Sequence, residues 1–122
     1  MSKAGRIAAY IERQYITERG QVRQNVEDLF AEDLAYHVGD ETLGREDVVA
    51  AVTAVRESPR DGRRVEPSRF VEDGDTVQWH LSATLPGMAA HGGDLIQESD
   101  LRAVFNAEGK IQEVWSEDSD TK

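Results

Sequence analysis

The chain has no cysteine, and only three prolines and three histidines, among its 122 residues. Without cysteine it cannot form a disulfide, a thiolate metal site or a cysteine nucleophile. This composition suits a reducing compartment, so we expect a cytoplasmic protein. The chain also lacks the apolar core of a signal peptide and any run of about 18 apolar residues. We therefore expect neither secretion nor insertion into a membrane.

Positive charge is scarce as well, because 14 Lys and Arg stand against 24 Asp and Glu and give a formal net charge of -10. Nucleic acids and anionic membranes bind basic surfaces, so neither is expected as a partner. The ligand should be neutral or only locally charged. Patterns such as His-x-His and His-Glu-x-x-His are missing too, which argues against a metal site.

The first half of the chain has the spacing of apolar residues that is typical of amphipathic helices. One helix is predicted over residues 3–18, a second from residue 21 to 31–33, and a third over residues 45–57. The third is rich in valine, a poor helix former, so packing must stabilise it. A short strand over residues 34–38 separates the second and third helices.

The second half predicts four longer strands, over residues 65–71, 76–85 and 95–105 and from 111 onward. Successive side chains of a strand point to opposite faces, so the alternation of apolar and polar residues predicts which of them face inward. The predicted inward set is Val77, Trp79, Leu81, Leu95, Gln97, Ser99, Leu101, Ile111, Glu113 and Trp115. The polar residues 117–122 are expected to fray.

This order of elements indicates one α+β domain over residues 1–122. Three N-terminal helices should cover one face of a curved, mostly antiparallel sheet shaped like a cone. Such an arrangement leaves an apolar hollow between sheet and helices, which is the usual place for a small ligand. The glycine-rich loop over residues 86–93 should lie at one end of the sheet.

Several short motifs resemble those of a known family. The chain resembles the SnoaL-like polyketide cyclases and ketosteroid isomerases, which share the nuclear-transport-factor-2-like cone fold. The motifs, in chain order, are Leu29-Phe30-Ala31-Glu32-Asp33, Tyr36-His37, Leu43-Gly44-Arg45-Glu46, Thr76-Val77-Gln78-Trp79, Leu85-Pro86-Gly87-Met88, Glu108-Gly109-Lys110-Ile111 and Trp115. Each motif is short, but their order and spacing span nearly the whole chain.

The resemblance implies an apolar pocket, acid/base chemistry on a small molecule without a cofactor, and a homodimer formed through the outer sheet face. It also implies catalytic carboxylates at two strand positions, which here fall on Val38 and Leu101. Asp100 is adjacent, but only a bulge would turn it inward. The tyrosine of the family's first helix corresponds to Tyr10, with Tyr15 as a second candidate.

Candidate catalytic residues follow from the predicted inward face. Glu113, if buried beside the two tryptophans, would have a raised pKa and act as an acid or base; the alternative is a solvated rim position. Tyr36 would donate a hydroxyl or only pack in the core. His91 would close the pocket mouth beside Met88, or be exposed on its loop. His37 should lie on the outer surface.

The remaining candidates would bind the substrate. Gln97 and Ser99 would orient a carbonyl or hydroxyl group, or else satisfy buried polar groups. The apolar wall would contain Tyr15, Val38, Trp79, Leu81, Met88, Leu101 and Trp115.

Three hypotheses remain open at this point. The first is an enzyme that moves protons on an apolar polyketide- or steroid-like molecule. The second is a binding protein for such a ligand, because Val38 and Leu101 replace the usual acids. The third is an interaction module with a polar outer sheet face of Gln78, His80, Glu98 and Arg102.

Overall fold

The computed structural model describes residues 1–120, with the side chains of residues 1–118. Its helical elements are α1 (Lys3–Ile11), the π-helical turn η1 (Glu12–Ile16), α2 (Val22–Leu29) and α3 (Arg45–Glu57). Its strands are β1 (Phe30–Val38), β2 (Glu41–Leu43), β3 (Arg64–Asp73), β4 (Thr76–Leu85), β5 (Leu95–Phe105) and β6 (Ile111–Asp120). The predicted α+β class is confirmed.

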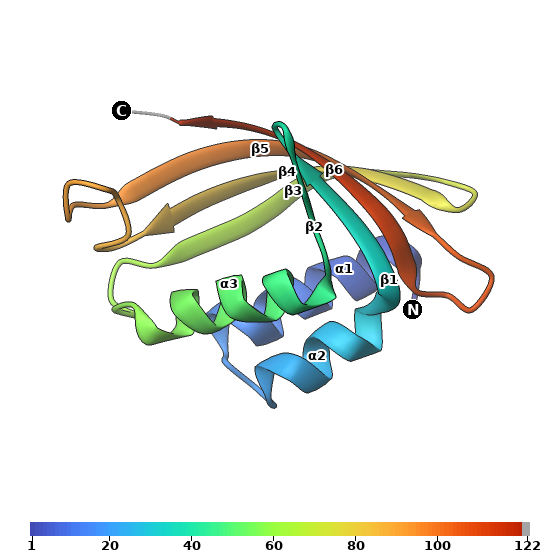
Figure 1. Cartoon of the computed structure of the whole chain (residues 1–122), viewed down its shortest axis with the longest axis horizontal. Helices are drawn as coiled ribbons and strands as arrows, with labels where there is room; N and C mark the ends of the chain where they lie inside the picture. The colour runs from blue at the N-terminus through green and yellow to red at the C-terminus, as the bar shows by residue number, and fades with distance from the viewer. Residues whose placement is uncertain (121–122) are drawn as a thin grey trace.

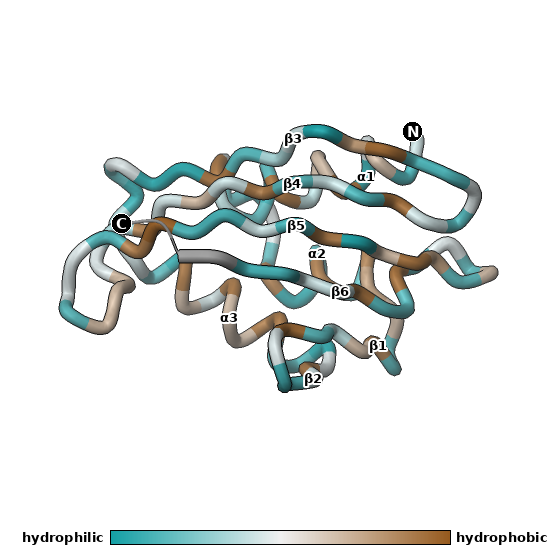
Figure 2. The backbone as a smooth tube through the Cα atoms, turned by 90° about the horizontal axis from the view of Figure 1, so that it is seen from above, coloured by the Kyte–Doolittle hydropathy of each residue, from teal (hydrophilic) through white to brown (hydrophobic). Residues whose placement is uncertain are grey.

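The six strands form one curved, open sheet in the order β2-β1-β6-β5-β4-β3. Strands β1 and β6 are parallel, and all other neighbours are antiparallel. The three helices lie together on the concave side, beneath the arch of the sheet (Figure 1). Seen from above, β3, β4, β5 and β6 run side by side and present the convex face, which the helices do not cover (Figure 2).

The first helix is not α-helical throughout. Ser2 caps α1 by accepting a hydrogen bond from the Gly5 N–H, but from Glu12 the chain winds as a π-helix. The wider turn buries Gln14 completely. The Gln14 side chain donates to the Val22 carbonyl and accepts from Asn25, so the irregular turn and α2 are joined by buried hydrogen bonds.

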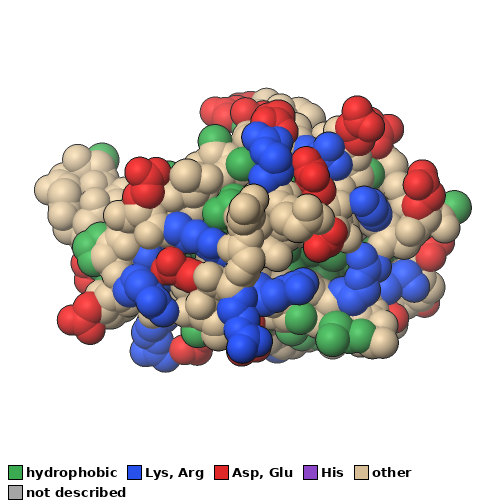
Figure 3. Space-filling view, turned by 90° about the horizontal axis from the view of Figure 1, so that it is seen from below, with side chains coloured by type: hydrophobic (Ala, Val, Ile, Leu, Met, Phe, Trp, Pro, Cys, Tyr) green, Lys and Arg blue, Asp and Glu red, His purple; other side chains and the backbone are tan. Residues whose placement is uncertain are grey.

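The helix layer is also held by an arginine. Arg56, in the last turn of α3, donates to the main-chain carbonyls of Arg13, Gln14 and Gly20. Arg13 and Gln14 lie in η1 and Gly20 lies just before α2, so Arg56 joins α3 to the segment between α1 and α2. Figure 3 shows the helix side, where Lys and Arg side chains gather between acidic ones. Arg56, one of the arginines on this side, thus binds main-chain carbonyls of the protein itself.

The structure corrects the prediction between the second and third helices. Helix α2 ends at Leu29, and Phe30 already begins β1. After β1 the chain turns at Gly39, which has a positive φ of 59°, and returns as β2. This three-residue strand was missed because it is too short to show alternation. The predicted bounds of α3, 45–57, are confirmed.

Strands β4 and β5 agree with their predicted alternation. Pro67 lies in β3, which is an edge strand and is shifted in register between Ser68 and Val71. The β4/β5 ladder has no shift from one end to the other. Asp100 therefore stays on the outer face, opposite His80, and no bulge turns it inward.

Strand β6 contains the main correction. Val104 pairs with Glu113, but Phe105 pairs with Ile111, so Gln112 is an extra residue in β6. Ile111 and Val114, both 1% exposed, face the core. The predicted inward orientation of Glu113 and Trp115 is therefore wrong, because one bulged residue reverses the alternation that follows it.

Strand β6 is also longer than expected. It pairs with β5 as far as Asp120, opposite Gln97, so residues 117–120, which were expected to fray, belong to the sheet. Residues 121 and 122 of that predicted tail lie outside the described residues. Within residues 1–120, no helix is long and apolar enough to cross a membrane.

Candidate functional site

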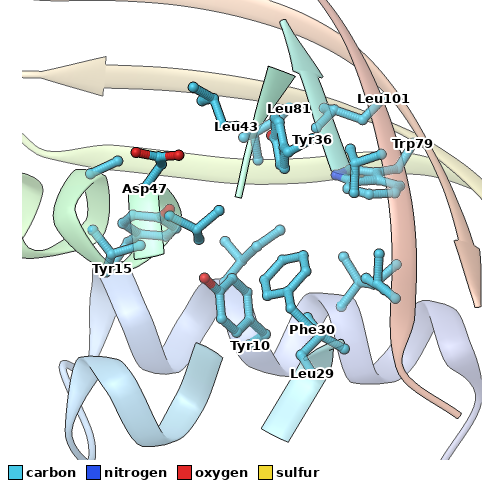
Figure 4. Close-up of a pocket in the computed structure, with 17 residues that line it drawn as sticks. Tyr10, Tyr15, Leu29, Phe30, Tyr36, Leu43, Asp47, Trp79, Leu81 and Leu101 are labelled. Atoms are coloured by element: carbon cyan, nitrogen blue, oxygen red, sulfur yellow. The ribbon is translucent and has the colours of Figure 1, made fainter. Parts of the chain in front are cut away.

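A pocket of about 190 Å³ lies between the concave sheet face and the helices. We call it the inner pocket. Its walls come from the helical elements α1, η1, α2 and α3 and from the strands β1, β2, β4, β5 and β6, and they are almost entirely apolar (Figure 4). The lining includes Tyr10, Tyr15, Leu29, Phe30, Tyr36, Leu43, Asp47, Trp79, Leu81 and Leu101. The lining therefore comes from both layers of the fold, the sheet and the helices.

Three tyrosines, Tyr10, Tyr15 and Tyr36, line the inner pocket. Burial raises the pKa of Tyr15 to about 12 and also raises the pKa of Tyr36. Burial raises the pKa of Tyr10 well above its usual value, and the neighbouring Tyr15 adds to this rise. All three phenols are thus neutral at ordinary pH, and each can donate a hydrogen bond to a bound oxygen atom.

Two buried donors in this pocket have no hydrogen-bond partner within the described residues. One is the Tyr10 hydroxyl and the other is the Trp79 indole Nε1. Gln14 lies near enough to Tyr10 to offset part of its pKa rise, but not in hydrogen-bonding geometry. Buried polar groups normally have partners, so an acceptor atom of a ligand that reached either donor would satisfy it.

Asp47 is the only charged residue that lines the inner pocket in the described part of the chain. It lies in the first turn of α3, where its Oδ2 accepts a hydrogen bond of 2.8 Å from the Gly44 N–H. This bond caps the helix and fixes the side chain. Figure 4 shows the Asp47 carboxylate at the same end of the pocket as Tyr15, with Trp79 at the opposite end.

The structure brings five of the predicted site residues to the inner pocket. Tyr15, Tyr36, Trp79, Leu81 and Leu101 all line it, as their helical or strand periodicity predicted. Leu101 lies at a position where the resemblance implied a carboxylate. Here the leucine side chain is part of the apolar wall instead.

Other predicted residues lie away from the inner pocket. Ser99 and Gln97 share the inward face of β5 with Leu101 but lie further along the strand. Val38 is likewise beyond the lining, near the end of β1. His91 is exposed on its loop, and its Nδ1 accepts a hydrogen bond from the Gly93 N–H. Neither His91 nor Met88 contacts the pocket, so the predicted closing role has no support.

Glu113 and Trp115 lie on the convex face, in a group that we call the His37 cluster. His37 Nε2 is 2.6 Å from Glu113 Oε2, and Nδ1 is 3.1 Å from Thr42 Oγ1. The His37 ring stacks on Trp115 with centroids 5.6 Å apart, and the Arg102 guanidinium lies 4.3 Å from the same indole. The bulge at Gln112 produces this cluster and removes Glu113 from the interior.

A second group on the convex face, the His80 cluster, contains His80, Ser82, Glu98 and Asp100. His80 Nδ1 is 2.8 Å from Asp100 and Nε2 is 2.7 Å from Glu98, while the Ser82 hydroxyl donates to Glu98. The bond to Asp100, followed by that to Glu98, raises the pKa of His80. The Ser82 bond, followed by His80, lowers the pKa of Glu98.

Sequence reasoning missed Asp47. The signal that indicates it is the segment Gly44-Arg45-Glu46-Asp47 before an apolar helix, in which an acidic residue three positions after the cap bonds back to the main chain. That pattern predicts a helix start, but not that the start lies at a pocket. No group of three or more potential metal ligands occurs in the described residues.

The comparisons with known proteins concern the fold. No family model and no curated protein matches the sequence. A candidate isomerase of the SnoaL-like family from Agrobacterium tumefaciens is 19% identical with a TM-score of 0.68, covering 98% of this chain and 99% of that one. An NTF2-like protein of unknown function from Exiguobacterium is 20% identical with a TM-score of 0.68, covering 98% and 100%.

The chain has the NTF2-like fold. A third solved structure has the same fold. It is the epoxide hydrolase/cyclase-like enzyme SalBIII, which has a role in pyran ring formation in the polyether salinomycin. It is 20% identical with a TM-score of 0.71, covering 96% of this chain and 90% of that one. Proteins with this fold thus include cyclase-like and isomerase-like enzymes, as well as one without a known function. The reaction of this chain must be argued from its own pocket.

Proposed function

We propose that the protein is a cofactor-independent enzyme that transfers protons on a small apolar carbonyl compound, as in enolisation, isomerisation or ring closure. The observation that carries this proposal is that neutral tyrosines and the Asp47 carboxylate line the same apolar pocket, with Tyr15 and Asp47 at one end of it. The cyclase-like and isomerase-like structural neighbours support the same class of reaction.

In the proposed reaction, the hydroxyls of Tyr10 and Tyr15 donate hydrogen bonds to the substrate carbonyl oxygen. Asp47 takes a proton from the adjacent carbon, and the electron pair of that C–H bond moves onto the carbonyl oxygen as an enolate forms. Fixed donors in an apolar site stabilise this negative charge more than water would. Asp47 then returns the proton to another carbon, which completes an isomerisation.

The test is exchange of the protons next to a ketone for deuterium, followed by NMR in deuterated water. Ketones are first selected by their stabilisation of the folded protein against heat. Asp47→Asn should lower the exchange rate by about 100-fold or more while binding persists, because the amide keeps the cap but is a poor base. Asp40→Asn, on the exposed β1–β2 turn, is the matched control and should leave the rate unchanged.

A binding protein for the same class of ligand is the second candidate. The observation that favours it is the composition of the pocket interior, where tyrosine hydroxyls and the indole N–H are the polar groups and Leu101 replaces an expected acid. Ketones that bind the wild type without any proton exchange above the solvent rate would establish this second function and reject the first.

We also propose that the protein forms a homodimer through its convex sheet face. Val71 is 59% exposed and Ile96 is 38% exposed on that face, and the Trp115–Arg102 pair adds residue types that are frequent in interfaces. Ile96→Asp should convert a dimer to a monomer in light scattering, whereas Ala50→Asp, on the helix side, should not. A stable dimer has a dissociation constant well below about 100 µM. A wild type that is monomeric at that concentration would therefore reject the proposal.

A further inference from the structure

The Trp79 indole is a fixed donor at the end of the inner pocket away from Asp47. The residue is 8% exposed, and its Nε1 has no acceptor among the described residues. Figure 4 shows the nitrogen on the side of the ring that faces Tyr36 and the middle of the pocket. An indole N–H only donates and does not ionise in the working range of a protein. Its missing partner must therefore be an acceptor.

The indole cannot easily turn away to find another partner. Phe70 stacks on it with centroids 6.2 Å apart and planes 20° apart. Its backbone is held in the regular β4/β5 ladder opposite Leu101. A donor that is held in place and left unpaired in an apolar wall favours any ligand that offers an oxygen atom at that point.

The volume of the inner pocket limits the size of that ligand. A cavity of roughly 150 Å³ holds one benzene ring, and the inner pocket measures about 190 Å³. One ring or two small fused rings fit this space, whereas the four fused rings of a steroid need more than it offers. Typical pockets for drug-sized ligands start at about 300 Å³.

We infer that the ligand is a compact one- or two-ring molecule with two acceptor oxygens, one at the tyrosine and Asp47 end and a second that binds Trp79 Nε1. This inference rests on the proposed function, because it takes the inner pocket as the ligand site. It narrows the substrate class from polyketide- or steroid-like molecules in general to small diketones, keto-ethers or lactones of similar shape.

The test uses decalin-1,5-dione, which has a carbonyl at each end, and 1-decalone, which lacks the second carbonyl. The wild type should bind the dione about 10-fold more tightly, since a hydrogen bond in an apolar site is worth about that factor. In Trp79→Phe, which keeps an aromatic ring against Phe70, the two affinities should become equal. The tetracyclic androstane-3,17-dione should bind the wild type at least about 100-fold more weakly than the bicyclic dione.

Indole NMR gives a direct readout, because the chain has two tryptophans and only Trp79 lines the pocket. With ¹⁵N-labelled tryptophan, the dione should shift the Trp79 N–H signal downfield and 1-decalone should not. Trp115, on the convex face, is the internal reference and should not move with either ligand.

The outcomes separate this inference from the proposed function. Equal affinity for the two bicyclic ketones in the wild type, or a preference that survives in Trp79→Phe, would overturn the role of Trp79 while the pocket remains the ligand site. Tight binding of the steroid dione would overturn the size limit alone. A wild type that binds none of the three ketones would overturn the pocket as a ligand site, and the proposed function with it.

Discussion

The two faces of the sheet use the same residue types in opposite ways. On the concave face, Trp79 packs on Phe70 and lines a pocket of neutral groups. On the convex face, Trp115 lies between a histidine and an arginine in a layer of charged side chains. The two tryptophans lie on strands of the same sheet, so their environments differ only because their strands present them to opposite sides.

A single bulged residue is responsible for this difference. Gln112 interrupts β6, and its side chain donates to Asp33 Oδ1 at 2.8 Å, across to the irregular part of β1. Without the bulge, Glu113 and Trp115 would face the helices, and the pocket would contain a buried carboxylate. The orientation of a site residue thus depends on a contact between residues 79 positions apart.

The two faces of the sheet should differ most in their tolerance of a charged side chain. Val114→Lys puts an ammonium group where the side chain is 1% exposed, and the free energy of unfolding should fall by more than about 4 kcal/mol, since the charge has no partner. Val104→Lys, on the convex face opposite Glu113, should change it by less than about 1 kcal/mol. Urea unfolding measures both. A loss in Val114→Lys as small as that in Val104→Lys would place Val114 on the outer face and restore the uninterrupted alternation of β6.

The two tryptophans themselves give the next comparison. Trp79→Ala should cost about 3 to 5 kcal/mol, because it leaves a cavity against Phe70. Trp115→Ala should cost about 1 kcal/mol, since only the half-exposed stack with His37 and Arg102 is lost. Thermal and urea unfolding should rank the variants in this order. Equal losses would mean that the convex stack is as well packed as the core.

The buried phenols of the inner pocket should respond to pH in the alkaline range. The pKa of Tyr15 is about 12 in the folded protein and near 10 when unfolded, so folding favours the protonated phenol. Stability is therefore complete below pH 10 and declines as the pH rises towards 12, by about 2 kcal/mol for this residue. Tyr15→Phe should reduce this decline, measured as unfolding free energy against pH. A decline of the same size in the variant would show that Tyr15 is not the cause.

The convex face should respond near neutrality, and weakly. The pKa of His80 is raised by Asp100 and Glu98, so its contribution is present below its unfolded pKa and is lost as the pH rises past the folded one. The melting temperature should fall between pH 6 and 8 by no more than about 4 °C, since the cluster is near solvent. His80→Gln should remove this fall, and His91→Gln should retain it. A slope that persists in His80→Gln would assign it to other groups.

Local patterns predicted most of the elements. The third helix has the predicted bounds. The alternation of β4 and β5 placed Trp79, Leu81 and Leu101 correctly, because no register shift intervenes. These features depend on residues that are neighbours in sequence or on one uninterrupted ladder.

The features that were missed depend on partners from elsewhere in the chain. The π-helical turn is held by Arg56, which binds carbonyls 42 and 43 positions away, and Asp47 meets the tyrosines only after α3 docks on the sheet. Strand β6 continues to Asp120 because β5 offers it a pairing edge, although its last residues are polar. Polar composition therefore predicted fraying where backbone pairing decides the structure.

The sequence by itself determined the α+β layout, the apolar concave stripe and the absence of cysteine chemistry, because these depend on composition and on the short-range period of helices and strands. Only the tertiary structure decided which carboxylate reaches the pocket. Asp47 lines the pocket because α3 packs under the sheet. Glu113 does not, because one bulged residue reverses the faces of β6 and leaves no trace in the local pattern.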